Sequence, residues 1–160
     1  MMDFRIGNGF DVHQLAPGFP LVLGGVKIAH TKGCVAHSDG DVLIHALCDA
    51  LLGALALGDI GKHFPDTDDA YDDIDSTILL ERTYAMVKEK GYSLVNADLT
   101  LLLQRPKIAP YIEQMRSRLA EVLETDTENI SVKATTTEHL GYEGREEGVS
   151  AYAVVLLSSK

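Results

Sequence analysis

The segment from Val149 to Leu157 is the feature that most restricts the fold, because it is apolar on both faces when extended. A half-buried strand alternates apolar and polar residues, whereas a strand buried on both faces forms a continuous apolar run. A chain of 160 residues is long enough for one domain with one core. Its own helices can cover one face of such a sheet, so we expect other subunits to cover the opposite face.

The remaining periodicities place helices and further strands around this segment. Residues 95–103 alternate apolar and polar side chains, which predicts a half-buried strand that ends before Pro106. Strands that alternate unevenly with helices favour an α+β fold, with helices packed on one face of a sheet, over a doubly wound parallel sheet. We expect a single compact domain over residues 1–160. The predicted elements are a first hairpin formed by strands 4–12 and 21–28, a helix entered at 38–41 and ending at 57, a loop at 59–75, a helix at 76–90, the strand at 95–103, a helix at 112–123, and strands at 130–136 and 149–157.

The net charge of the chain limits the kinds of molecule that it can bind. Lys and Arg number 14 and Asp and Glu number 24, so the net charge is −10, which argues against nucleic-acid binding by a basic patch. A small phosphorylated substrate remains compatible with this charge if bound cations neutralise it. No apolar run reaches the ~18 residues of a membrane helix, and the first residues do not resemble a signal peptide. Cys34 and Cys48 form no CxxC pair. We therefore expect a cytoplasmic protein.

Three side chains are candidate metal ligands. Asp11 and His13 are two residues apart, so on a strand they project to the same face. His45 lies in the apolar first helix, where Asp41 and Asp49 stand at helical spacing from it and form a polar stripe. A buried polar stripe needs a metal or a hydrogen-bond network. Asp-His-His with an open fourth position is the catalytic form of a zinc site. A surface acid beside a hydrogen-bonded histidine is the alternative.

Four further segments carry polar groups at element ends, and each has a structural alternative. The pair His37-Ser38 at a helix entry favours anions or simply caps the helix. Residues 59–68 form either a ligand loop or an acidic surface turn. Residues 133–138 end a strand with hydroxyl groups and Glu138, which could hold a hard cation such as magnesium. Residues 105–107 end another strand with positive charge, which suits a phosphate, a base edge or solvent.

These segments together resemble one enzyme family. The motifs are RIGNGFDVH at 5–13, AHSDGD at 36–41, DIG at 59–61, FPDTD at 64–68, KATTTE at 133–138, LG at 140–141 and GR at 144–145. They occur in this order from Arg5 to the last strand and resemble the 2-C-methyl-D-erythritol 2,4-cyclodiphosphate synthases. The agreement of several separate motifs over nearly the whole chain makes the resemblance specific.

The resemblance implies a homotrimer with active sites between adjacent subunits. The implied enzyme is a phosphorus-oxygen lyase of the non-mevalonate isoprenoid pathway. It converts 4-diphosphocytidyl-2-C-methyl-D-erythritol 2-phosphate to the 2,4-cyclodiphosphate and releases CMP. The resemblance also implies a zinc ion on Asp11, His13 and His45, and a magnesium or manganese ion that Glu138 holds against the substrate diphosphate. His37 and Thr136 match the pair of residues that stabilises the transition state.

The same resemblance assigns substrate contacts. For the methylerythritol phosphate they are Asp11, His13, His37, Ser38, Asp59, Ile60, Gly61, Phe64, Pro65, Asp66, Thr67 and Asp68. For the cytidine and the diphosphate they are Leu103, Gln104, Arg105, Pro106, Lys107, Ile108, Ala109, Thr135, Thr136, Thr137 and Glu138, with Tyr142 and Arg145 in a further ligand-contacting stretch.

Two other functions are compatible with these residues. One is a metal-dependent phosphohydrolase that uses the Asp-His-His set to activate water, and the other is a trimeric module that binds nucleotides without turnover. The chain also departs from the family after Asp68, where a basic, glycine-containing flap is common. Here the segment 69–75 reads DAYDDID and is acidic.

Overall fold

The computed structural model describes all 160 residues and places the long strands in one mixed sheet. The strand order is β4 (Lys32–Val35), β1 (Phe4–Pro17), β7 (Gly148–Ser159), β5 (Tyr92–Leu102) and β6 (Ile130–Thr135). Neighbouring strands are antiparallel except for β5 and β6, which are parallel. A separate two-stranded hairpin consists of β2 (Leu21–Leu23) and β3 (Val26–Ile28).

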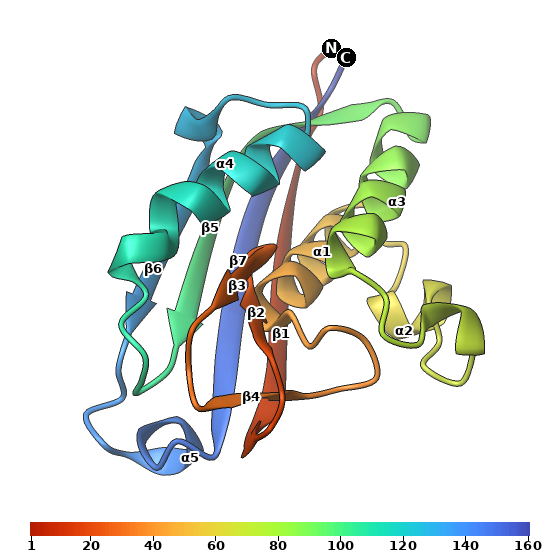
Figure 1. The fold of residues 1–160 in the computed structure, drawn as a ribbon. Helices are drawn as coiled ribbons and strands as arrows, with labels where there is room; N and C mark the ends of the chain where they lie inside the picture. Colours follow the sequence, from red (N-terminus) through yellow and green to blue (C-terminus); the bar gives the residue numbers. More distant parts are fainter.

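Three helices cover one face of this sheet, and the hairpin β2–β3 lies on the same side between α4 and α1 (Figure 1). They are α1 (Val42–Ala54), α3 (Ser76–Glu89) and α4 (Ile112–Val122). Two short helices, α2 (Ile60–His63) and α5 (Gly141–Gly144), and three 3-10 turns, η1 (Asp69–Tyr71), η2 (Ala109–Tyr111) and η3 (Thr127–Asn129), lie in the connections. The expected α+β class, with helices on one face of a sheet in a single domain, is confirmed. None of the helices is both long and apolar enough to cross a membrane.

The central helix α1 packs directly against the backbone of β1. A Cβ atom added at Gly7 would lie 1.8 Å from the carbonyl oxygen of Ala50, and one added at Gly9 would lie 1.8 Å from that of Ala46. Both glycines face the helices, because side chains alternate along β1 and Leu15 on the same face is buried. Only glycine permits this approach, so these two positions fix the distance between α1 and the sheet.

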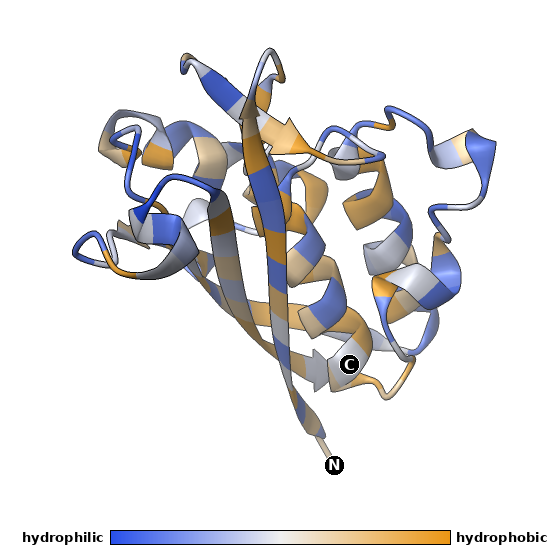
Figure 2. Ribbon diagram, turned by 90° about the horizontal axis from the view of Figure 1, so that it is seen from below, coloured by the Kyte–Doolittle hydropathy of each residue, from blue (hydrophilic) through white to orange (hydrophobic).

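The opposite face of the sheet carries exposed apolar side chains. Ile6, which is 73% exposed, Phe10 and Val12 project from β1, and Tyr152 and Val154 project from β7. The rings of Phe10 and Tyr152 are 4.9 Å apart between centroids, so they form a cross-strand aromatic pair. Along the strand that starts at the labelled N-terminus, hydrophilic and hydrophobic bands alternate (Figure 2). The apolar residues of β7 therefore divide between a helix-covered face and an open face, as the last segment of the sequence predicts.

The predicted first hairpin is wrong in its pairing. β1 continues to Pro17 and pairs with β7 and β4, and it does not pair with the segment 21–28. That segment folds back on itself instead, because Gly24 and Gly25 adopt positive φ angles of 60° and 74° and form a two-residue turn. The first helix ends at Ala54, earlier than predicted, and the predicted loop at 59–75 contains α2 and η1.

Candidate active site

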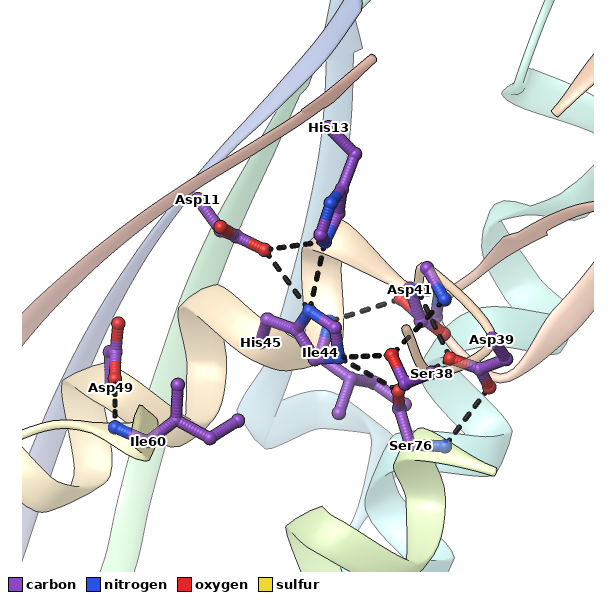
Figure 3. Close-up of polar contacts among 12 residues, drawn as sticks. Asp11, His13, Ser38, Asp39, Asp41, Ile44, His45, Asp49, Ile60 and Ser76 are labelled. Atoms are coloured by element: carbon purple, nitrogen blue, oxygen red, sulfur yellow. Dashed lines mark hydrogen bonds and ion pairs between the residues drawn. The ribbon is translucent and has the colours of Figure 1, made fainter. Parts of the chain in front are cut away.

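The three candidate metal ligands converge at one point between β1 and α1 (Figure 3). Asp11 Oδ2 lies 3.0 Å from His13 Nε2 and 3.1 Å from His45 Nδ1, and the two ring nitrogens are 3.0 Å apart. Alternation along β1 places Asp11 and His13 on the helix-facing side, beyond Gly7 and Gly9. The first turns of α1 place His45 opposite them.

The geometry and chemistry of these donors fit a metal ion. Two ligands bound at about 2.0 Å to a tetrahedral zinc ion lie about 3.3 Å apart, close to the observed separations. Both imidazole nitrogens can hydrogen-bond to Asp11 only as N–H donors, whereas with their lone pairs free they can bind one cation together with the carboxylate oxygen. The fit is therefore good for a cation that needs two imidazole nitrogens and one carboxylate oxygen.

The electrostatics of the cluster favour positive charge beside Asp11. Burial raises the pKa of Asp11, but the hydrogen bonds and charges of His13 and His45 outweigh it and hold that pKa well below its usual range. Burial lowers the pKa of His45, but the hydrogen bond and charge of Asp11 raise it above the ordinary value. The cluster thus favours an ionised carboxylate at Asp11.

The far side of the His45 ring is held by hydroxyl groups. Its Nε2 atom lies 2.9 Å from Ser76 Oγ and 3.3 Å from Ser38 Oγ. The Ser76 hydroxyl donates in turn to Asp39 Oδ1 at 2.5 Å. His45, which is 8% exposed, and Ser76, which is fully buried, form a polar network next to Asp11 and His13, the other two candidate ligands (Figure 3). The sequence predicts that a buried polar residue in this helix needs a metal or a hydrogen-bond network. In the structure, hydroxyl groups and the Asp11 carboxylate surround His45 and form such a network.

The two carboxylates at helical spacing from His45 have other partners. Asp41 caps α1 and accepts the backbone N–H groups of Gly24, Gly25 and Ile44 at 2.9, 2.7 and 3.1 Å. Burial raises the pKa of Asp41 to about 6. Asp49 accepts the backbone N–H of Ile60 at 2.7 Å and ties α2 to α1. Asp41 therefore holds the β2–β3 turn and Asp49 holds α2 beside the cavity, and neither is a fourth ligand.

A cavity of about 250 Å³ opens beside the three candidate ligands. Its lining includes predicted substrate-contacting residues, namely His37, Ser38, Ile60, Gly61, Phe64 and Asp66. The sequence reading missed four lining residues, Ala36, Tyr71, Ile74 and Leu79. Tyr71 and Ile74 are the only large apolar residues in the acidic segment 69–75, and that isolation is the signal that could have found them. In the same segment, Asp72 Oδ1 lies 3.4 Å from His37 Nε2.

A second cavity, of about 220 Å³, gathers most of the residues expected to contact cytidine. It is lined by Leu103, Gln104, Pro106, Lys107, Ile108, Ala109, Thr135 and Thr136, together with Ile112 and Ala134, which the sequence reading did not include. The two cavities are on different parts of the sheet. Asp11 pairs with Ala151, which pairs with Leu101, which pairs with Ala134. At about 4.8 Å per strand, three strand spacings separate the two sites by about 14 Å.

The remaining predicted site residues line neither of these cavities. Asp59 caps α2 and accepts the N–H of Lys62; Arg105 lines a different cavity with His30 and Thr31; and Tyr142 contacts Ser150 through its hydroxyl. Arg145 forms an ion pair with Glu147 at 3.1 Å. The others are Pro65, Thr67, Asp68, Thr137 and Glu138. Glu138 is exposed and stands apart from the one group of three side chains that could hold a metal, so its role stays a prediction.

Comparison with known proteins gives consistent matches over the whole chain. The model of the YgbB family matches residues 4–158. A 2-C-methyl-D-erythritol 2,4-cyclodiphosphate synthase of Bacillus cereus (strain B4264) is 59% identical over 157 residues, which cover 98% of this chain and 99% of that protein.

Solved structures agree with this match. A structure of 2C-methyl-D-erythritol-2,4-cyclodiphosphate synthase in a CDP-bound form superimposes with a TM-score of 0.89 at 41% identity, over 96% of this chain and 99% of that one. The bifunctional IspDF of Campylobacter jejuni superimposes with a TM-score of 0.96 at 46% identity. The match covers all of this chain but only 43% of the bifunctional one.

Proposed function

This chain belongs to the YgbB family, and we propose that it converts 4-diphosphocytidyl-2-C-methyl-D-erythritol 2-phosphate to 2-C-methyl-D-erythritol 2,4-cyclodiphosphate with release of CMP. It would thus be a phosphorus-oxygen lyase of the non-mevalonate isoprenoid pathway. The observation that carries the proposal is the convergence of Asp11, His13 and His45 beside a cavity, in a chain 59% identical to a synthase of that name. The cytoplasmic location expected from the sequence stays a prediction.

We assign zinc to the three converging ligands and magnesium or manganese to Glu138 together with the substrate diphosphate. Asp11, His13 and His45 would hold the zinc ion, which would supply positive charge beside a phosphoryl oxygen of the substrate. The donor set supports zinc, since imidazole nitrogen and carboxylate oxygen are both common zinc ligands. Hard cations such as magnesium are usually bound through one or two carboxylates and the phosphates of the substrate, which fits a single exposed carboxylate at Glu138.

The side chains of the two cavities would bind the two ends of the substrate. The cavity beside the ligands would hold the methylerythritol phosphate, with Ser38 and Asp66 in its lining. The second cavity, which Lys107 and Thr135 line, would hold the cytidine. His37 and Thr136 line one cavity each, and we propose that they stabilise the charge that develops on the phosphates between them.

The reaction needs little proton transfer from the protein. An oxygen of the substrate's own phosphate attacks the diphosphate while the bond to CMP breaks, and both groups are stable as anions near neutral pH. Neither step therefore requires a general base or acid from the protein. The main obstacle is repulsion, since two unit charges at 4 Å cost about 4 kcal/mol at an effective dielectric of 20. Holding the reacting groups in line can contribute up to about 7–11 kcal/mol.

We further propose a homotrimer in which neighbouring subunits complete each active site. Two observations support it. The two cavities are separated by about 14 Å within one chain, which is compatible with a site formed by the methylerythritol cavity of one subunit and the cytidine cavity of a neighbouring subunit. The open face of the sheet also exposes Ile6, Phe10, Val12, Tyr152 and Val154, and such contiguous apolar surface is typical of an interface.

The test combines metal analysis of the purified protein with phosphorus NMR of the reaction. The expected result is stoichiometric zinc and conversion of the substrate to the cyclic diphosphate and CMP. Formation of an open monophosphate with consumption of water would instead identify a phosphohydrolase. Nucleotide binding without any turnover would identify a non-catalytic binding module.

The matched variant is His13→Ala, which removes one zinc ligand from an edge of the cavity. We expect it to lose turnover and zinc while circular dichroism shows an unchanged fold, because His13 is only partly buried. Turnover equal to that of the parent protein would remove the metal assignment.

A further inference from the structure

The polar network behind His45 includes Ser76, the first residue of α3. Ser76 is fully buried at the first position of that helix, yet its cap is Asp75. The Ser76 hydroxyl turns instead toward the interior, where it lies between His45 Nε2 and Asp39 Oδ1 (Figure 3). The arrangement links a carboxylate, a hydroxyl and an imidazole in one line.

The direction of each hydrogen bond in this line follows from Asp39. Its Oδ2 accepts the backbone N–H of Ser76 at 2.9 Å, and its Oδ1 accepts the backbone N–H of Asp41 at 3.1 Å. Both oxygens are therefore acceptors. The single hydroxyl proton of Ser76 goes to Asp39 at 2.5 Å, so the Ser76 oxygen faces His45 with lone pairs only.

We propose that Ser76 and Asp39 are positioning residues that fix the proton of His45 on Nε2. With a hydroxyl oxygen as its acceptor, Nε2 carries the N–H, and Nδ1 presents its lone pair to the point where Asp11 and His13 converge. A metal-binding histidine commonly donates its other N–H to an oxygen acceptor that fixes its tautomer and orientation. This inference rests on the metal site of the proposed function and adds two residues that the sequence reading did not assign to it.

Ser38 does not duplicate this function. Its oxygen lies farther from Nε2, at 3.3 Å compared with 2.9 Å for Ser76, and it also accepts the backbone N–H of Gly40. Ser38 has no carboxylate that takes up its proton, so its hydroxyl group can rotate. Only the Ser76 hydroxyl has its orientation fixed by a charged partner.

The test measures zinc affinity directly, by competition with a chromophoric chelator at about pH 8, above the ordinary pKa of histidine of about 6.5. We compare the parent protein with Ser76→Ala and Asp39→Asn. Ser76→Ala removes the acceptor, and Asp39→Asn leaves one amide oxygen where two acceptors are needed. The control is Thr77→Val, since the neighbouring Thr77 hydroxyl is also buried but donates to Asp75, outside the line.

The expected result is a loss of zinc affinity of about 10–100-fold for Ser76→Ala and Asp39→Asn, with the parent affinity retained in Thr77→Val. A second measurement is independent of affinity. In the zinc-loaded, nitrogen-15-labelled parent, the Nε2 proton of His45 should give a slowly exchanging imidazole signal, and Ser76→Ala should lose it through fast exchange with water. Melting temperatures of the metal-free proteins show whether each variant is folded.

Two results would overturn the inference, and they are distinguishable. If the parent binds zinc and Ser76→Ala binds it equally well with the same imidazole signal, Ser76 does not position His45 and the proposed function stands. If the parent binds no zinc, the metal site itself is wrong and this inference falls with it. Should Ser76→Ala fail to fold, Asp39→Asn decides between the same outcomes.

Discussion

Substitution of Gly9 by alanine tests whether the contact between β1 and α1 builds the metal site. The new Cβ would lie 1.8 Å from the carbonyl oxygen of Ala46 and 2.8 Å from both its carbonyl carbon and the backbone nitrogen of Ala50. All three are backbone atoms of α1, so no side chain can turn aside. Contacts below 3.0 Å are essentially never observed for real Cβ atoms. The helix must therefore move away from the strand by at least 3.0 − 1.8 = 1.2 Å.

This displacement is large for both stability and metal binding. Forcing extra atoms into a packed core costs about 1–3 kcal/mol, and we expect the upper end because backbone must move. For a chain of this size, 3 kcal/mol lowers the melting temperature by about 6–12 °C. His45 precedes Ala46 in α1 and would move with it, whereas metal–ligand distances tolerate changes of only about 0.2 Å. Gly9→Ala should therefore lose zinc as well as stability.

The matched control is Gly53→Ala, on the same helix. Its added Cβ would have one neighbour, the carbonyl oxygen of Asn8 at 3.8 Å, which is an ordinary contact. Replacing glycine by alanine inside a helix stabilises it by about 0.5–1 kcal/mol. Thermal unfolding followed by circular dichroism and zinc content after dialysis compare the two variants. If Gly9→Ala melts with the parent and keeps its zinc, the glycines do not set the position of His45.

Two further predictions concern the buried carboxylate of Asp41 and the assembly. Because the folded pKa of Asp41, about 6, lies above its ordinary value of 3.8, its contribution to stability is complete below pH 3.8 and is lost as the pH rises through about 6. As the pH falls from about 7.5 to about 4, the unfolding free energy of the metal-free parent should rise by about 3 kcal/mol relative to that of Asp41→Asn, as measured by urea titration. If the unfolding free energies of the two proteins change in parallel with pH, the prediction is wrong. Mixing His13→Ala and Thr136→Val chains through denaturation and refolding should restore about a quarter of parental activity, since half of the subunits supply each intact cavity (1/2 × 1/2). If the mixture stays inactive while each variant is folded and trimeric, each site is built within one subunit.

The sequence predicts those parts of the site that depend on local geometry. Asp11 and His13 share a face because any strand has a period of two, and this was predicted correctly. Thr135 and Lys107 line one cavity, as the resemblance to the family led us to expect, but strand pairing brings them together. The spacing along the chain decides only the first of these two arrangements.

Other parts depend on contacts between distant segments, which the spacing does not contain. The pairing of β1 with β7 joins residues about as far apart as the chain allows, and the local hairpin rule pointed to the wrong partner. Ser76 is a residue type common at helix caps and stands at the start of a helix, so nothing in the sequence around it indicates that its hydroxyl faces His45. The separation of the predicted contacts into two cavities follows from strand order, which no motif specifies.

The helix-facing side of β1 shows how one local pattern prepares a distant contact. Along this face the residues are Gly7, Gly9, Asp11, His13 and Leu15. Two glycines are followed by two proposed zinc ligands and then by a buried core residue. On α1, the small residues Ala46, Ala50 and Ala54 recur every four positions, and all three lie nearest to the two glycines. Small residues on both elements let their backbones meet, and the first position beyond this contact on each element carries a proposed zinc ligand. The close approach that stabilises the core thereby also sets the separation of His45 from Asp11, so stability and metal geometry should fail together whenever this contact is widened.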